Sequence, residues 1–151
     1  MVDLNVAKSP FTLIRSDILK FNIINDPLKI RNEDDVSRQF GIDYKTEIIH
    51  TSDTQILGSL LLACGIDITQ NDDTLLKIKI NIRGIFSAPI EFTQEKFIQM
   101  LELNGITALY SILRGKVTSL SSLCCPEEII DLPMININKL IQEKHKQNDN
   151  T

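Results

Sequence analysis

The sequence predicts an α+β domain in which a four-stranded antiparallel sheet, arranged as a meander, carries helices on one face. Two observations predict this class. Apolar and polar residues alternate with a period of two through much of residues 10–83, as in strands with one wet face. After Pro89 the apolar residues instead recur at helical spacing, as far as residue 120. Short polar turns between the strands favour antiparallel neighbours.

The first two predicted strands cover residues 10–24 and 40–50. In the first, the alternation slips near Arg15, which is typical of a bulge. The second places Phe40 and Ile42 on one face, with polar residues on most of the other face. It is therefore expected to have one buried and one solvated face.

The third predicted strand, residues 55–68, is apolar on both faces. One face carries Ile56, Leu60, Leu62 and Cys64, and the other carries Leu57, Leu61 and Ala63. A small meander has no layer of its own to cover the second face. We therefore expect a partner subunit there.

The fourth predicted strand has the cleanest alternation in the chain. Its inward residues are Leu76, Ile78, Ile80 and Ile82, and its outward residues are Lys77, Lys79, Asn81 and Arg83. The preceding Asn-Asp-Asp sequence at residues 71–73 is typical of a turn.

Two helices are predicted after the strands. Thr93 is a suitable N-cap for the first, and Asn104 followed by Gly105 is a suitable end. Pro126 ends the second. The second helix carries one apolar stripe, which consists of Leu109, Ile112, Leu113, Val117 and Leu120.

A last helix through Ile141 is predicted, capped by Asn136 or Asn138. Residues 142–151 are polar, so we expect them to form a flexible C-terminal tail. A single domain over residues 1–141 is therefore expected, followed by this tail.

Composition excludes several function classes. A net charge of -4 and dispersed basic residues argue against a nucleic-acid partner. The longest apolar run, residues 60–64, is too short to enter and span a membrane. The N-terminal residues lack the pattern of a targeting segment, and the three cysteines are an odd number. We expect a cytoplasmic protein.

Cofactor or covalent chemistry is not expected. His50, Cys64, Cys124 and Cys125 lack the paired spacing of zinc ligands. His145 lies in the predicted tail, and no third group is positioned to orient a cysteine and histidine pair. The sequence therefore predicts no metal, no catalytic residue and no enzyme.

Three short motifs in the second half of the chain occur in a specific order. Gly84-Ile85-Phe86-Ser87 ends the fourth strand, and Arg114 is followed by Val117-Thr118-Ser119-Leu120. The last motif keeps Leu132, Asn136 and Leu140 at fixed spacing. In order and spacing these motifs resemble the SecB-type protein-export chaperones.

This resemblance implies an ATP-independent holdase that binds unfolded polypeptides or preproteins in apolar grooves. The groove residues that we expect are Ile85, Phe86, Tyr110, Leu132, Met134, Ile135 and Ile137. For any one of them, a place in the hydrophobic core is the alternative. The family's dimer of dimers implies a homo-oligomer, and the expected interface residues are Leu57, Leu61, Leu109, Leu113 and Val117.

Two departures from the family keep an alternative open. Lys79 stands where family members use an acid to meet the translocase motor SecA, and residues 123–128 replace a Gly-x-Phe-Pro turn beside the groove. The alternative is a SecB-like interaction subunit, or a dedicated chaperone for one partner such as a toxin-antitoxin protein, without handover to SecA.

Overall fold

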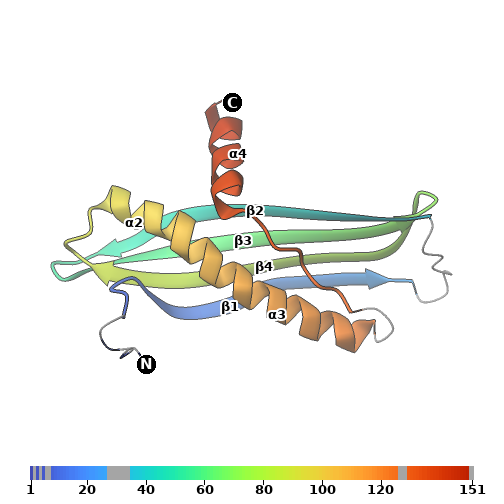
Figure 1. The fold of residues 1–151 in the computed structure, drawn as a ribbon, viewed down its shortest axis with the longest axis horizontal. Helices are drawn as coiled ribbons and strands as arrows, with labels where there is room; N and C mark the ends of the chain where they lie inside the picture. Colours follow the sequence, from blue (N-terminus) through green and yellow to red (C-terminus); the bar gives the residue numbers. More distant parts are fainter. Residues whose placement is uncertain (2, 4, 6–7, 27–34, 126–128, 150–151) are drawn as a thin grey trace.

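A computed structural model describes residues 1, 3, 5, 8–26, 35–125 and 129–149, and shows an antiparallel sheet crossed on one face by a long helical segment (Figure 1). The strands are β1 (Thr12–Asn25), β2 (Val36–Thr51), β3 (Gln55–Gln70) and β4 (Asp73–Pro89). The predicted α+β class with a four-stranded antiparallel sheet is confirmed.

The order of the strands differs from a simple meander. Across the sheet it is β1-β4-β3-β2, so only β2, β3 and β4 follow one another, and β1 pairs with β4. This is a Greek-key order. The chain between Asn25 and Val36 would reach about 36 Å when extended, whereas three strand spacings need only about 14 Å. A long connection therefore permits β1 to join the far edge.

One turn and one strand irregularity occur where the sequence predicted them. The turn between β3 and β4 has positive φ at Asn71 (50°) and Asp72 (66°), as a two-residue type I′ turn requires. In β1 the register shifts between Leu13 and Arg15 and again between Ile18 and Lys20. The predicted bulge near Arg15 is therefore confirmed, and a second bulge follows it.

The two predicted helices form one continuous helical segment, which consists of α2 (Gln94–Met100), the π-helical turn η2 (Leu101–Gly105) and α3 (Ile106–Cys124). The predicted end at Asn104 and Gly105 was wrong. A Cβ at Gly105 would lie 3.3 Å from Cδ2 of Leu60, so this glycine lets the helix approach the sheet. The Thr93 cap is confirmed, because its side chain accepts from the amide of Lys96. Pro126 lies outside the described residues.

The last helix, α4 (Ile137–Asp149), is longer than predicted. The side chain of Asn136, one of the two predicted caps, accepts from the amide of Lys139 at 3.0 Å. The helix continues through most of the predicted polar tail, because Lys144 and His145 contact the body of the protein. None of the helices in the described ranges has the length and apolar character needed to cross a membrane.

The hydrophobic core lies between α3 and the sheet. The inward residues predicted for β4, Leu76, Ile78, Ile80 and Ile82, are all fully buried. Three residues predicted for an oligomer interface, Leu109, Leu113 and Val117, are also at most 1% exposed in the single chain. In this structure they belong to the core, because the apolar stripe of α3 faces its own sheet. Leu57 and Leu61 are half-buried on the other sheet face, which we call the open face.

Candidate functional site

Residues 129–136, here called the crossover segment, connect the end of α3 to α4 and run beside α3 without joining the sheet (Figure 1). Residues 129–134 have no regular secondary structure. Backbone groups of such a segment need partners from elsewhere. The polar side chains of α3 supply several of them.

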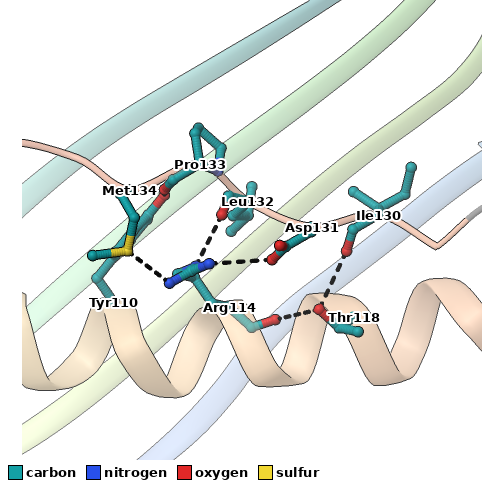
Figure 2. A network of polar contacts seen from close by, with 8 residues as sticks. All are labelled: Tyr110, Arg114, Thr118, Ile130, Asp131, Leu132, Pro133 and Met134. Carbon is teal, nitrogen blue, oxygen red and sulfur yellow. Dashed lines mark hydrogen bonds and ion pairs between the residues drawn. The ribbon is translucent and has the colours of Figure 1, made fainter.

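Arg114 is the centre of these contacts (Figure 2). Its Nε donates to the Leu132 carbonyl oxygen at 2.9 Å, and one terminal nitrogen lies 3.3 Å from the Asp131 carboxylate. The other terminal nitrogen lies 3.0 Å from Sδ of Met134. One half-buried guanidinium therefore contacts three residues of the crossover segment.

Residues one helical turn to either side of Arg114 also contact the crossover segment. The Tyr110 hydroxyl donates to the Pro133 carbonyl oxygen at 2.6 Å, and burial raises the pKa of this tyrosine. The single Thr118 hydroxyl proton is shared between the Arg114 carbonyl oxygen of its own helix, at 3.0 Å, and the Ile130 carbonyl oxygen, at 3.2 Å. The buried Ser121 accepts from the Ile130 amide at 3.3 Å. The crossover segment is thus held through its backbone.

The side chains of the crossover segment point in two directions. Ile130 and Leu132 are 5% and 1% exposed and pack into the core. Ile129 and Met134 are 68% and 82% exposed. Both of these exposed apolar side chains are therefore accessible to a partner.

The structure brings together only part of the predicted groove. Tyr110, Leu132 and Met134 meet where α3 faces the crossover segment, but the first two are buried (Figure 2). Ile135 and Ile137 are half-buried beside the core. Phe86 is 1% exposed and stacks on Phe11 in the core. Ile85 alternates with Phe86 along β4 and so lies on the open face, away from the others.

Two of the three hydrogen-bond donors of this site were not predicted as site residues, whereas Tyr110 was predicted for the groove. Arg114 and Thr118 were recognised only as part of a motif, and no role followed for them. The available signal was the four-residue spacing of Tyr110, Arg114 and Thr118, which places them on one side of a helix.

A second polar cluster joins α4 to the edge strand β2. The carboxylate of Glu102 accepts from the Tyr44 hydroxyl at 3.0 Å and lies 3.0 Å from Nε2 of His145. Lys144 donates to Asp43 at 2.6 Å, and this hydrogen bond lowers the pKa of Asp43. Burial, together with the bond to Glu102, raises the pKa of Tyr44. A pocket of about 420 Å³ lies among these residues.

A third feature is a mainly apolar pocket of about 430 Å³ where α3 meets β1. It is lined by Ile18, Ile112, Gly115, Lys116, Ser119 and Leu120. Ile112 and Leu120 were predicted for the apolar stripe, but they lie at its side and are only half-buried.

Among the residues that the structure describes, no group of three His, Cys, Asp or Glu side chains is placed to hold a metal ion. All three cysteines are free thiols. Cys64 is buried in β3, and desolvation raises its pKa to about 11. This thiol is therefore a poor nucleophile at neutral pH.

The sequence matches no protein-family model and no curated protein. The solved structures with a similar fold include two of low sequence identity. One is the SecB-like chaperone of Mycobacterium tuberculosis in complex with a peptide from an antitoxin, with 12% identity, a TM-score of 0.67, and coverage of 83% of this chain and 91% of that chain.

The other is a Streptococcus agalactiae protein of unknown function, with 8% identity, a TM-score of 0.51, and coverage of 82% of this chain and 97% of that chain. Similarity at such low identity concerns the fold. The fold that the sequence motifs implied is therefore found in the structure: this chain has a divergent SecB-like fold.

Proposed function

We propose that this protein is an ATP-independent, cytoplasmic holdase that binds unfolded polypeptides or preproteins. The observation that supports the proposal most is the similarity to a SecB-like chaperone that was solved with a peptide bound. The exposed Ile129 and Met134 beside α3 add apolar surface of the kind that such binding needs.

Binding in this proposal needs no covalent step. The holdase stabilises unfolded chains against aggregation by mass action, because it binds the unfolded state and not the folded one. Exposed methionine suits this role, since its flexible and polarisable side chain adapts to different apolar partners. We therefore propose no enzymatic activity and no cofactor.

A homo-oligomer, arranged as a dimer of dimers, is part of the proposal. A single apolar site binds an extended chain weakly, but several sites on one oligomer raise the effective concentration for each further contact. Leu57 and Leu61 on the open face are the remaining candidates for an interface between subunits.

A second candidate function is a dedicated chaperone for one partner, such as an antitoxin, without handover to SecA. Two observations favour it. The similar SecB-like chaperone of Mycobacterium tuberculosis holds a peptide from an antitoxin. Lys79 is exposed on the open face, at the position where SecB-type chaperones use an acid to meet SecA. Protein export and handover to SecA would belong to the first candidate only.

Dilution of a chemically denatured protein into buffer, followed by light scattering without ATP, tests the holdase. We expect the wild-type protein to suppress aggregation near one oligomer per client, and Met134→Lys to suppress it less. Ile49→Lys is the matched control, because Ile49 is also exposed, at 53%, but lies on β2. Equal suppression by both variants would remove the crossover segment from the site, and no suppression by the wild type would leave the dedicated partner as the better candidate.

A further inference from the structure

Three side chains of α3 form a regular row of hydrogen-bond donors. They are Tyr110, Arg114 and Thr118, and we call them the donor row (Figure 2). Running along α3, they contact the carbonyl oxygens of Pro133, Leu132 and Ile130 at 2.6, 2.9 and 3.2 Å. The crossover segment therefore runs antiparallel to the helix.

The spacing of the donor row fits an extended chain for a geometric reason. Four residues of an α-helix advance by about 6 Å. Two residues of an extended chain advance by about 6.6 Å. Donors at every fourth helical position can therefore meet alternate carbonyl groups of an extended polypeptide, as Arg114 and Thr118 do with Leu132 and Ile130. Tyr110 instead bonds the carbonyl oxygen of Pro133, the residue adjacent to Leu132.

The contacts of the donor row are mostly independent of sequence. Each of its three members binds a backbone carbonyl oxygen, which every amino acid has. Only Arg114 also touches side chains, those of Asp131 and Met134. Beside the row, the side chains of Ile130 and Leu132 are buried in the hydrophobic core, and we call the two places that they occupy the slots. Backbone bonds plus slots for alternate side chains are the arrangement by which proteins bind extended peptides.

From this arrangement we infer that the donor row and the two slots are a binding site for an extended polypeptide with apolar side chains at alternate positions. In the free protein, residues 130–133 occupy this site themselves. A client enters by exchange: it takes over the bonds from Tyr110, Arg114 and Thr118 while residues 130–133 leave, and Ile129 and Met134 remain beside the client. This inference rests on the proposed holdase function and assigns its site.

Exchange of this kind makes client binding gradual and reversible. Each hydrogen bond lost to the chain's own carbonyl oxygen is replaced by one to the client, so no buried donor stays unpaired. The affinity then depends on how well the apolar side chains of the client fill the slots of Ile130 and Leu132. Residues 130–133 compete with the client for the site, and their effective concentration is high because they belong to the same chain. This competition lowers the apparent affinity for short clients.

Leu132→Ala tests the exchange, because it weakens the occupant of one slot. The probe is a fluorescein-labelled synthetic peptide with the sequence of residues 129–136, measured by fluorescence anisotropy. We expect at least tenfold tighter peptide binding to Leu132→Ala than to the wild type, and no binding of a peptide with aspartate in place of both slot residues. Leu75→Ala is the control for general destabilisation, because Leu75 is equally buried but lies in β4.

Hydrogen exchange on the wild-type protein provides an independent test that needs no destabilised variant. When a reduced, carboxymethylated polypeptide is added, the amides of residues 130–132 should exchange faster than in the free protein. Slower exchange there would mean that the client covers the segment, and the exchange inference would be wrong although the holdase stands. If this polypeptide does not bind, the proposed holdase function is wrong. The peptide measurement then still tests the exchange: equal peptide affinity for the wild type and Leu132→Ala would overturn the exchange inference.

Discussion

Phe97 of α2 lies directly over Gly58 of β3. A Cβ at Gly58 would lie 2.5 Å from Cε1 of the Phe97 ring and 2.9 Å from the carbonyl oxygen of Glu47. Both distances are shorter than van der Waals contact, and the second involves backbone that cannot move freely. The absence of a side chain at Gly58 therefore sets how closely the helical layer approaches the sheet.

Gly58→Ala is expected to lower the free energy of unfolding by about 1–3 kcal/mol, the usual cost of overpacking a core. Urea denaturation followed by circular dichroism measures it. Gly41→Ala is the matched control, because Gly41 is also in a strand but a Cβ there meets nothing within 4 Å. A loss as large in the control as in Gly58→Ala would show that strand glycines, and not the Phe97 contact, determine the result.

Glu102→Ala is expected to loosen α4. Its carboxylate accepts from Tyr44 and contacts His145, so the substitution removes the acceptor for both and costs about 1–3 kcal/mol. Hydrogen exchange should show faster exchange throughout α4, with β3 and β4 little changed. Glu143→Ala is the control, since Glu143 pairs with Lys146 inside α4. Unchanged exchange in α4 after Glu102→Ala would mean that its other contacts, including the Lys144–Asp43 ion pair, are sufficient to hold it.

Alkaline pH is expected to destabilise the protein. The pKa values of Tyr44 and Tyr110 are raised from 10.0, and that of Cys64 is raised to about 11, mainly because the groups are buried. A raised pKa means that the folded state keeps a proton that the unfolded state releases. The free energy of unfolding therefore falls as the pH rises from the pKa of the group in the unfolded state to its pKa in the folded state. Titration of the tyrosines should leave the urea concentration at the unfolding midpoint unchanged up to about pH 9 and should lower it above that pH. Tyr44→Phe should make the decrease shallower, and a flat profile to about pH 11 would contradict the prediction.

The three cysteines should differ in reactivity. Cys124 is exposed, whereas Cys64 and Cys125 are buried. With a colorimetric disulfide reagent at pH 8, the folded protein should show one fast thiol, and all three should react in denaturant. Loss of the fast phase in Cys124→Ser would confirm the assignment. Two fast thiols in the wild type would show that the end of α3 opens.

Local features of the fold were predictable because they depend on neighbouring residues. The alternation of β4, the turn at Asn71 and Asp72, and the Thr93 cap each follow from a few adjacent side chains. The position of β1 beside β4 depends on pairing between residues far apart in sequence, such as Ile18 and Ile82. Alternation of apolar and polar residues shows which face of a strand is buried, but it is the same whether the strand lies at one edge of the sheet or at the other.

The helical elements show where local signals were overridden. Asn104 and Gly105 are typical of a helix end. The helix nevertheless continues past them, because Gly105 packs against Leu60 of the sheet. The length of α4 depends on partners outside the helix, since Lys144 binds Asp43, 101 residues away in sequence. The polar sequence of residues 142–151 does not reveal such distant partners, so a flexible tail was predicted.

The candidate site was predictable in its apolar part only. Tyr110, Leu132 and Met134 do meet beside α3, while Ile85 and Phe86 lie on opposite faces of β4. Polar residues on a helix usually face water, so the four-residue spacing of Arg114 and Thr118 alone did not indicate that they bind carbonyl groups of the crossover segment.

The most direct measurement is calorimetric titration of the protein, without ATP, with one polypeptide in two forms: reduced and carboxymethylated, and native with its disulfides. A holdase of this fold should bind the unfolded form with about one client per oligomer and give no heat with the native form. Equal binding of both forms, or binding of neither, would contradict the proposed function.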